Sequence, residues 1–486
     1  MNTDYIPDLK KAFFGDSDAY TEKDRDPQKF EKSFYDPHNY LKELLYGYKF
    51  VVNGRKGDGK SAYSAKICLM SNQPSSQVKA VPRSLSNFNN VTFNKLKTYE
   101  NLGGNPYISL WKCILMIETV NMLESFQPNI QATSYCAILS ALDDAGLLEN
   151  DNISNTIDTL VETNTSINIK NLFNHGKRKQ TSSVLSGAEQ IYKSIYKAIR
   201  TVYMGNTHYY LIIDGLDDIL INSDRVFQST VLTGLLRAAD EINTKFIHAT
   251  LHLKILIMMR SDILNLCIDP NLQKIKDDSC INLSWKIDDD IYESDLVKLV
   301  EKRLNITNDH QICFEKYWNS IFPKAIGTKP SFEYMLENII YRPRDILRFF
   351  KEAQIKFKNR KYTIDEFKTL LTDYSENYFL DAMKNELAGF FPDEVVNKLP
   401  EIMSKLGSQY FYIQDVEKMI NVDSTLANVN VYDLLDKLFN AGYIGQHRHR
   451  DTQNYTVFKY RNPRETFHEN DECIIHRGLQ RAFSLI

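Results

Sequence analysis

The chain has 486 residues, of which 43% are hydrophobic and 25% charged, and its formal net charge at pH 7 is −3. This composition is typical of a globular protein with two or three domains, and the charge excludes a uniformly basic nucleic-acid coat protein. No apolar run is long enough to span a membrane and no leader is evident, so we expect a cytoplasmic protein. The seven cysteines include no C-x-x-C pair, which is typical of buried free thiols rather than a zinc site or a disulfide framework.

An aromatic and acidic segment precedes the first predicted strand. Residues 1–47 combine phenylalanines and tyrosines with many acids and amides, and the end of the segment, 40–48, favours a helix. We predict an N-terminal arm that lies either over a bound ligand or against the protein without contacting one.

A phosphate-binding loop follows the first predicted strand. Gly54 ends a short apolar run, four residues lead to Gly59, and Lys60 and Ser61 open an alanine-rich helix. Glycines let the backbone curl so that its N–H groups face one concavity, and the helix N-terminus adds positive charge. The pattern predicts ATP binding, with the Lys60 ammonium on the β- and γ-phosphates and the Ser61 hydroxyl on Mg²⁺, whereas the alternative is a glycine-rich surface turn. The predicted nucleotide-binding residues of this loop are Gly54, Arg55, Lys56, Gly57, Asp58, Gly59, Lys60, Ser61 and Ala62.

Three segments separate this loop from the next strand. Residues 71–90 are rich in Ser, Asn, Gln and Pro, which predicts a loop. The apolar spacing in 107–124 predicts a mostly buried helix with Trp111 in the core. Helical tendency continues from about 128 to 200, where we predict a helical insertion that ends in an amphipathic helix. Its basic run, 177–179, is either a phosphate-backbone contact or a solvated charge cluster.

The second half of the predicted site is a buried strand over 208–214 that ends in Asp214. Open α/β sheets bind ligands at the carboxyl ends of such strands, so Asp214 is the expected Mg²⁺ ligand. A carboxylate that polarises the attacking water would normally follow at once, but Gly215 occupies that position. Asp217 and Asp218 are therefore the candidates for this role. A helix N-cap with an acid in the first helical turn is the alternative for this pair.

Further elements alternate in the manner of an α/β sheet. A helix is predicted over 225–243 and a buried strand over 252–260, where Arg260 or the following serine is placed to approach the γ-phosphate. A short strand and a helix follow up to residue 304. This succession predicts a doubly wound parallel sheet.

A second helix start carries two arginines. Pro343 and Asp345 are favourable at the first turn of a helix. Arg342 and Arg344 gather at the positive end of that helix, an arrangement that costs repulsion unless an anion is near. A bound triphosphate would supply the anion, so we assign Arg342 to nucleotide binding and Arg344 to catalysis. The alternative is that either arginine pairs with an acid of the core.

The last hundred residues change character. Helices are predicted near 401–406, 413–420 and 431–441, followed by two strand-like runs, which together predict a winged-helix domain. The hairpin over 446–461 carries four cations against one acid, so it is locally basic. Such a hairpin is suited to a nucleic-acid backbone, whereas other winged helices dock proteins or inhibit their own chain.

With these motifs in place, the chain resembles bacterial stand-alone P-loop ATPases related to AAA+ and STAND proteins, including origin-recognition-like initiators and ATPases of phage-defence loci. The resemblance implies ATP and Mg²⁺ at the phosphate loop, hydrolysis at the acid-rich strand end, and nucleotide sensing by the Arg-Pro-Arg helix. The chain lacks the Asp-Glu pair usual at the second motif, which implies slow turnover. The resemblance rests on residues 54–61, 214–218, 341–345, 458–461 and 475–479.

We therefore expect an α/β fold with a doubly wound P-loop core, a helical insertion, a helical lid and a winged helix. The predicted segments are an arm (1–47), an ATPase core (48–305), a lid (306–392) and a winged-helix domain (393–486). The expected function is Mg²⁺-dependent ATP binding and slow hydrolysis that controls the winged helix, with DNA or a partner protein as the output. A homo-oligomer, and a role in antiviral defence or DNA transactions, are also expected. The alternative is a non-hydrolysing, nucleotide-gated scaffold for a separate effector protein, and a small-molecule kinase is the least supported function because no substrate lid is evident.

Overall fold

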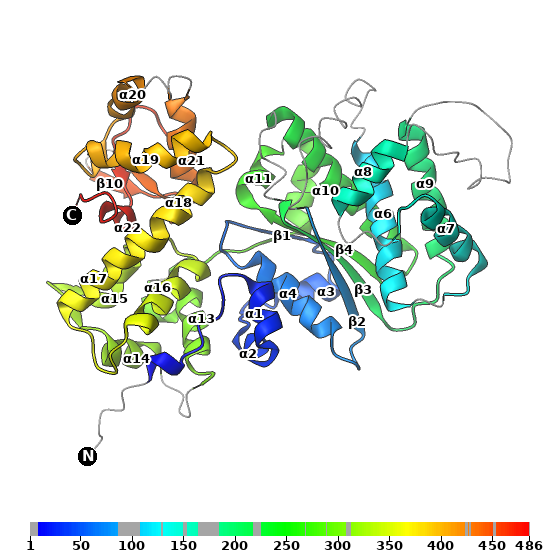
Figure 1. The fold of residues 1–486 in the computed structure, drawn as a ribbon, viewed down its shortest axis with the longest axis horizontal. Coiled ribbons are helices and arrows are strands. Elements are labelled where there is room, and N and C mark those ends of the chain that lie inside the picture. The colour runs from blue at the N-terminus through cyan, green and yellow to red at the C-terminus, as the bar shows by residue number, and fades with distance from the viewer. Residues whose placement is uncertain are drawn as a thin grey trace, which may run out of the picture. The chain divides into compact units, whose positions relative to one another are not determined.

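The computed structural model describes residues 8–85, 107–127, 130–148, 153–163, 184–216, 225–267, 269–287, 289–307, 313–422, 426, 429–450 and 453–485. The chain divides into two compact units, and Figure 1 labels many of their helices and strands. The sheet unit comprises His38–Gly54 and Lys60–Leu283. The C-terminal unit comprises Met1–Pro37, Arg55–Gly59 and Ser284–Ile486. The residues Arg55–Gly59, which we call the loop tip, thus group with the C-terminal unit, and the predicted N-terminal arm is divided after Pro37.

Five parallel strands form the sheet in the order β2-β3-β4-β1-β5. The central strands β3 and β4 are almost continuously apolar, because a parallel sheet with helices on both faces buries both sides of each strand. The predicted doubly wound parallel sheet is confirmed. The strands are β1 (Val51–Gly54), β2 (Val78–Ser84), β3 (His208–Asp214), β4 (Leu253–Arg260) and β5 (Cys280–Asn282).

Helices cover both faces of the sheet, as Figure 1 shows. On one face, Tyr210 donates its hydroxyl to the Leu45 carbonyl at the end of α3 (Tyr40–Tyr46) at 2.7 Å, and α4 (Lys60–Ser71) lies on the same face. Tyr209 points to the opposite face, where Gln127 bonds to its hydroxyl directly after α6 (Tyr107–Phe126). The remaining elements around the sheet are α10 (Arg225–His248), which packs on α6 and β4, α11 (Ser261–Leu266), α12 (Pro270–Lys274) and a π-helical turn (Ile275–Ser279).

The segment predicted as an insertion is helical where it is described. It contains α7 (Thr133–Asp144), α8 (Ile153–Thr163) and α9 (Val184–Ile199), and α9 packs along α6. Trp111 is buried and donates its indole N–H to the Val231 carbonyl at 3.0 Å, which confirms its predicted place in the core. The basic run 177–179 lies outside the described residues.

One prediction in this unit is wrong. The segment 71–90 was expected to be a loop, but it contains β2, which pairs with β3 from Val78 to Ser84. Strand β2 lies at the edge of the sheet and contains Pro82. An edge strand tolerates a proline and polar side chains because one of its sides has no neighbouring strand. The polar, proline-containing composition of this segment therefore led to the wrong prediction of a loop.

The C-terminal unit begins with the part of the arm that ends at Pro37 and continues into a helical lid. Pro343 is the first residue of α16, as predicted. Trp318 lies in the centre of an aromatic core, with ring centroids 4.2 Å from Phe322 and 4.9 Å from Phe332. The helices are η1 (Leu9–Lys11), α1 (Ala19–Arg25), α2 (Pro27–Ser33), η6 (Ile291–Glu293), α13 (Asp295–Leu304), α14 (Phe314–Ile321), α15 (Ser331–Leu336), α16 (Pro343–Lys356), α17 (Ile364–Tyr374), a π-helical turn (Ser375–Phe379) and α18 (Leu380–Leu387), and a small hairpin joins β6 (Ala325–Ile326) to β7 (Lys329–Pro330).

A winged-helix domain closes the chain. Three helices are followed by an antiparallel hairpin, in a four-stranded sheet ordered β10-β9-β11-β8. This arrangement confirms the predicted order of three helices and a hairpin, but the first helix, expected near 401–406, begins at Asp393 and contains Pro400. The elements are α19 (Asp393–Lys405), β8 (Tyr410–Phe411), α20 (Ile413–Val422), α21 (Val431–Ala441), β9 (Ile444–Arg450), β10 (Gln453–Val457), β11 (Cys473–Ile475) and α22 (Arg477–Gln480).

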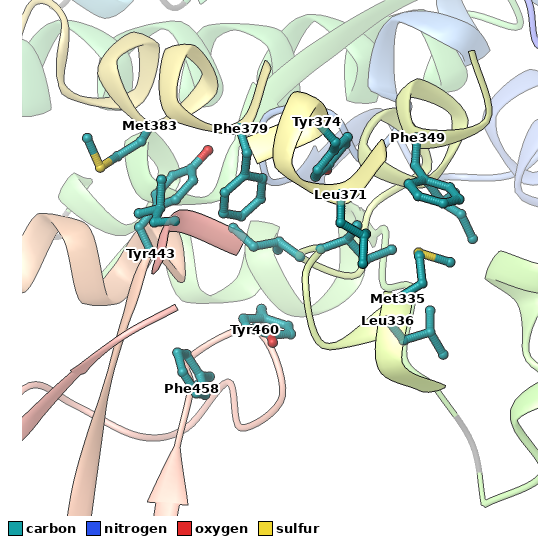
Figure 2. Packing of buried hydrophobic residues seen from close by; sticks show 14 of the residues in the cluster. Met335, Leu336, Phe349, Leu371, Tyr374, Phe379, Met383, Tyr443, Phe458 and Tyr460 are labelled. Atoms are coloured by element: carbon teal, nitrogen blue, oxygen red, sulfur yellow. The ribbon is translucent and has the colours of Figure 1, made fainter. Parts of the chain in front are cut away.

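The lid and the winged helix share one hydrophobic core. Figure 2 shows Tyr374, Phe379 and Met383 of the lid beside Tyr443 and Tyr460 of the winged helix. The Phe379 and Tyr443 rings lie 5.2 Å apart. Because close-packed interiors transmit displacements, the two modules behave as one packed body within this unit.

Two further expectations concern the whole chain. Among the described residues, no helix has the length and apolar character needed to cross a membrane. All seven cysteines are free thiols, but Cys136 and Cys313 are exposed, so the expectation that every thiol is buried is wrong for these two.

Candidate nucleotide-binding site

The phosphate loop has the backbone that its glycines predict. Strand β1 ends at Gly54 and helix α4 begins at Lys60. Gly57 and Gly59 have φ values of +91° and +98°, in the region that disfavours any side chain. A Cβ atom on Gly57 would also lie 3.1 Å from Cβ of Arg344, whereas one on Gly59 would meet nothing within 4 Å. Backbone conformation thus requires glycine at both positions, and close packing requires it at Gly57 as well.

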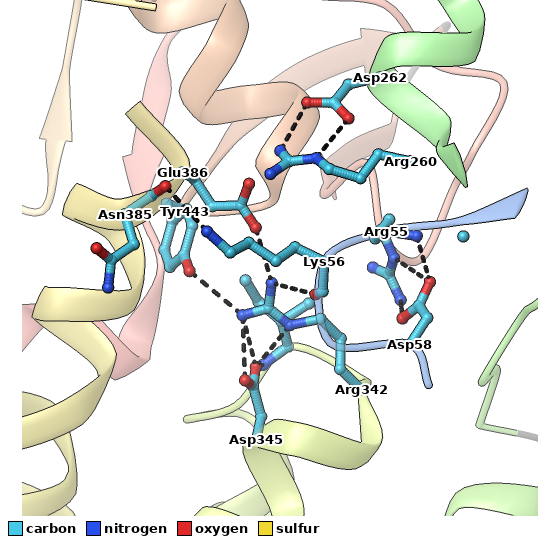
Figure 3. Close-up of polar contacts among 12 residues, drawn as sticks. Arg55, Lys56, Asp58, Arg260, Asp262, Arg342, Asp345, Asn385, Glu386 and Tyr443 are labelled. Atoms are coloured by element: carbon cyan, nitrogen blue, oxygen red, sulfur yellow. Dashed lines mark hydrogen bonds and ion pairs between the residues drawn. The ribbon is translucent and has the colours of Figure 1, made fainter. Parts of the chain in front are cut away.

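A buried acid lies inside the loop tip. The Asp58 carboxylate is 1% exposed, accepts the Arg55 backbone N–H at 2.7 Å, and forms an ion pair with the Arg55 guanidinium at 3.4 Å (Figure 3). Arg55 also donates to the Tyr341 carbonyl at 2.8 Å, and the Trp285 indole N–H donates to the Asp58 carbonyl at 2.9 Å. A buried carboxylate must be paired to be tolerated, and here Arg55 neutralises it. The loop tip therefore remains compatible with an anionic ligand.

The first turn of α4 carries the predicted phosphate and metal residues. Lys60 is the first residue of this twelve-residue helix, and its ammonium donates to the Gly54 carbonyl at 2.9 Å. Ser61 and Ala62 follow in the same turn and are half-buried. The N-terminus of an α-helix offers unpaired N–H groups and a partial positive charge to an anion.

Asp214 is the last residue of β3, and the carboxyl end of β3 lies on the same side of the sheet as the carboxyl end of β1. Ile257 of β4 pairs with Val51 on one side and with Ile213 on the other, so the two strands are in step across β4. Two strand spacings amount to about 10 Å. The Asp214 carboxylate accepts the Gly215 N–H at 2.8 Å, and Gly215 has a φ of +72°. The strand register thus confirms the prediction that the carboxyl ends of β1 and β3, which are far apart in the sequence, lie on the same side of the sheet.

The donor set fits a magnesium nucleotide. Mg²⁺ takes one or two oxygens from protein side chains and most others from phosphates and water. Ser61 and Asp214, both in the sheet unit, supply a hydroxyl and a carboxylate of this kind. Within the described ranges, no three His, Cys, Asp or Glu side chains assemble into a closed metal site. Asp217 and Asp218, the predicted water-positioning residues, lie outside the described residues.

The neighbouring strand ends are already engaged with protein groups. Arg260, opposite Gly54 in the register, is buried and makes a bidentate pair with Asp262 at 2.9 and 2.7 Å. Asn53 donates to the Asn282 amide oxygen at 2.8 Å. Because Asp262 holds the Arg260 guanidinium, the prediction that Arg260 approaches the γ-phosphate gains no support from its contacts.

The two arginines at the start of α16 have different surroundings. The Arg344 N–H lies 3.4 Å from the Gly57 carbonyl, and the Arg344 side chain runs beside Gly57. Its half-exposed guanidinium makes no ion pair or hydrogen bond with another described residue. Arg342, by contrast, is buried and paired with Asp345 at 3.0 Å and with Glu386 at 3.4 Å. The alternative given above for either arginine was an acid of the core, but both acids that pair with Arg342 belong to helices α16 and α18 of the C-terminal unit.

Three cations of the basic hairpin are also engaged by the protein. Arg448 pairs with Glu465 and, at 3.2 Å, with Asp471. Lys459 donates to the Glu465 carbonyl, and burial lowers the pKa of its ammonium. The Arg461 guanidinium lies 5.3 Å from the Tyr341 and Tyr460 ring centroids. The fourth cation, residue 450, has a side chain outside the described set. Acids therefore neutralise the charge of Arg448, whereas Lys459 and Arg461 keep their charges and are held by a carbonyl and by aromatic rings.

Comparison with known proteins finds a family model that matches one segment of the chain. Residues 294–382, from α13 into α18, match the model of a FunZ-associated C-terminal helical domain. No curated protein matches the chain. Among solved structures, the chain is similar to the Orc1 protein of Aeropyrum pernix in complex with DNA, with 10% identity and a TM-score of 0.39 over 94% of this chain and 92% of that chain. At this level of likeness, the assignments below rest on the chain's own residues.

Proposed function

We propose that the protein binds ATP together with Mg²⁺, hydrolyses it slowly, and uses the nucleotide state to set the geometry of its winged-helix domain. The observation that carries this proposal is the phosphate loop, in which Gly57 and Gly59 adopt positive φ values between β1 and the helix that begins at Lys60. This conformation gathers backbone N–H groups at a helix N-terminus, which favours a phosphate chain over any neutral ligand.

Each predicted residue then has a chemical role. Lys60 carries the charge that binds the outer phosphates, and its present acceptor, the Gly54 carbonyl, is a weaker partner than a phosphate oxygen. Ser61 and Asp214 would hold Mg²⁺, which neutralises charge that develops on the phosphates during transfer. Asp217 and Asp218 remain the candidates for orienting the attacking water.

Arg344 is the second cation that we assign to the phosphates. Its guanidinium is half-exposed, lies beside Gly57 of the loop tip, and is not paired with any described acid. A cation at a helix N-terminus opposes the helix dipole, and an anionic ligand relieves this opposition. We therefore expect Arg344 to strengthen ATP binding and to stabilise charge during hydrolysis.

A non-hydrolysing, nucleotide-gated scaffold is the second candidate function. The observation that favours it is Gly215, which follows Asp214 at the position where a water-polarising carboxylate would be expected. Without a carboxylate there, water activation depends on residues further along the chain. Phosphate release measured beside nucleotide retention separates slow hydrolysis from none.

The output of the winged helix is DNA or a partner protein. Arg448 is paired with acids and Lys459 is bonded to a carbonyl of the same chain, so among the hairpin cations whose side chains the structure describes, only Arg461 is exposed. This limited basic surface favours a protein partner, which includes a second copy of the chain or a separate effector. A role in antiviral defence or DNA transactions stays a prediction from the family resemblance.

Substitution of Lys60 tests the proposed function. Lys60→Ala removes a charge-assisted contact, so we expect ATP affinity to fall roughly 10- to 100-fold and phosphate release to be lost. Isothermal titration and a phosphate-release assay, each with and without Mg²⁺, provide the measurement. Lys368→Ala, an exposed lysine on α17, is the matched control. Wild-type ATP affinity in the Lys60 variant would contradict the proposal.

A further inference from the structure

One buried guanidinium joins three parts of the C-terminal unit. Arg342 is 3% exposed and donates to the Lys56 carbonyl of the loop tip at 3.2 Å. It also donates to Glu386 of α18 at 3.4 Å and to the Tyr443 hydroxyl of the winged helix at 3.2 Å. Asp345, one turn into α16, holds the other edge of the fork with two bonds of 3.1 Å (Figure 3).

We call Arg342 and its four partners (Lys56, Asp345, Glu386 and Tyr443) the junction. The planar guanidinium of Arg342 makes this junction stiff. The guanidinium has five donors in a fixed plane, and here they are shared among an aspartate, a glutamate, a backbone carbonyl and a phenol. Asp345 is itself fixed by the Tyr378 hydroxyl at 2.8 Å and by the Ile340 N–H at 3.2 Å. Because every partner is buried or belongs to the backbone, rotating the guanidinium would leave donors unpaired in the interior.

Tyr443 transmits the position of the winged helix to this junction. It follows Gly442, whose φ of +90° ends α21, and its ring is fully buried against Phe379. A Cβ atom on Gly442 would lie 2.9 Å from the Tyr460 ring, so the turn is also packed tightly. The hydroxyl of Tyr443 therefore moves only when α21 and the β9 strand that follows it move.

The contact with Lys56 orients a peptide of the phosphate loop. In a trans peptide, the C=O and the following N–H point in opposite directions. The Lys56 carbonyl points to Arg342, so the Gly57 N–H points away from Arg342. Arg342 thereby fixes the direction of one of the loop donors that an anion requires, and a donor that is already oriented binds more tightly than one that must be ordered.

We propose that Arg342 and Tyr443 are positioning residues that couple the winged helix to the phosphate loop. The winged helix, through the Tyr443 hydroxyl, holds the Arg342 guanidinium, which holds the Lys56–Gly57 peptide in the orientation that binds phosphate. This inference rests on the proposed function. It assigns Arg342 to the loop backbone instead of the nucleotide, and leaves Arg344 as the arginine for the phosphates. By reciprocity, bound ATP stabilises the docked winged helix.

Tyr443→Phe is the test, because it removes one hydroxyl and keeps the packed ring. We expect faster hydrogen exchange of peptides that cover 54–61, measured without nucleotide, and a loss of ATP affinity of about 3- to 10-fold. Tyr374→Phe is the matched control, since Tyr374 is also buried, also contacts Phe379, and its hydroxyl has no hydrogen-bond partner among the described residues. Arg342→Lys, which keeps the charge but loses the planar fork, should reproduce the Tyr443 effect.

The outcomes separate this inference from the function on which it rests. Equal loop exchange in wild type and Tyr443→Phe, or the same acceleration in Tyr374→Phe, would overturn the coupling. If Lys60→Ala binds ATP like wild type, the proposed function fails, yet the exchange measurement still decides the coupling because it uses no nucleotide. If Lys60→Ala loses ATP while Tyr443→Phe keeps wild-type affinity and exchange, the coupling alone fails.

Discussion

At the scale of single residues, the unusual feature of the phosphate loop is a buried carboxylate in a loop that would bind phosphate. Asp58 is held by the Arg55 N–H and guanidinium, so its charge is compensated within the loop tip. The Asp58 carboxylate accepts the Arg55 N–H, and the Asp58 N–H donates to the Arg55 carbonyl at 3.2 Å. Together the two bonds close a short turn. The acid therefore shapes the loop, and Arg55 prevents it from repelling an anion.

Removal of the Arg55 side chain should leave the negative charge of Asp58 without a compensating cation. Arg55→Ala leaves the buried Asp58 carboxylate without its cation, so ATP affinity should fall about 10-fold. In the double variant, Asp58→Asn is added to Arg55→Ala. The asparagine has no charge but keeps an acceptor for the backbone N–H of residue 55, so this variant should recover most of the lost ATP affinity. Titration calorimetry on the single and double variants provides the measurement. An equally weak double variant would show that the shape of the arginine, and not charge compensation, is what matters.

At the scale of elements, the junction of β11 and α22 depends on an uncharged histidine. His476 is buried, caps α22 by accepting the Gly478 N–H at 3.0 Å, and lies 3.1 Å from the Tyr460 hydroxyl. Burial, together with the positive charges of Arg461 and Arg342, lowers the pKa of this imidazole to about 3. Protonation of His476 is therefore incompatible with the folded junction.

This burial predicts a loss of stability in mild acid. Below a pH of about 6.5 the unfolded chain protonates His476 whereas the folded chain does not, so the unfolded state binds more protons. The contribution of His476 to stability is complete above about pH 6.5 and falls as the pH decreases toward 3, by roughly 3 kcal/mol at pH 4.5. His476→Asn keeps a capping acceptor but does not titrate. Urea unfolding of both proteins between pH 4.5 and 7.5 should give a shallower pH dependence for the variant, and equal slopes would refute this assignment.

At the scale of the whole molecule, the fold compensates part of the positive charge that is concentrated in the hairpin sequence. Glu465 and Asp471 lie outside the strands of the hairpin, yet they meet Arg448 because the chain returns after β10. The aromatic rings that hold Arg461 come from the same hairpin and from Tyr341 of the lid. The return of the chain thus neutralises Arg448, one of the cations that lie close together in the sequence.

DNA binding should accordingly depend only weakly on salt. Each phosphate contact contributes about −0.9 to the slope of log affinity against log salt concentration, so we expect a slope shallower than about −2 between 50 and 200 mM salt. Fluorescence anisotropy with a labelled duplex provides the measurement, with Lys459→Ala as a variant that should leave the slope unchanged because Lys459 is already bonded to the Glu465 carbonyl. A slope steeper than about −4 would show that the winged helix releases its cations for DNA.

Much of the fold could be predicted from local sequence. The strand before the phosphate loop, the strand ending in Asp214, and the helix beginning at Pro343 each carry strong local signals of apolar runs, turn residues and capping residues. The winged-helix elements α20 and α21 were predicted within two residues of their observed bounds for the same reason. Strand β2 was missed because an edge strand has weak apolar periodicity and accepts a proline.

The candidate site was predicted only in part. A phosphate loop is one continuous segment, so its glycines, lysine and serine reveal it directly, and Asp214 follows from the rule that parallel strands bring their carboxyl ends to one edge. Arg342 was assigned to the nucleotide because two arginines at a helix N-terminus suggest a nearby anion, and its pairing with Asp345, three residues on, and with Glu386 was not predicted. Glu386 is 44 residues away and Tyr443 is 101 residues away, and neither lies in a recognisable motif.

The sequence by itself determined where the chain forms its glycine turn between β1 and α4 and which strands and helices flank that turn, because backbone conformation and apolar periodicity are set by near neighbours. Only the tertiary structure decided which charges are free. Burial and pairing depend on which side chains the fold brings together, and this is why Arg344 makes no ion pair with a described residue while Arg342, two residues earlier, is enclosed by the protein.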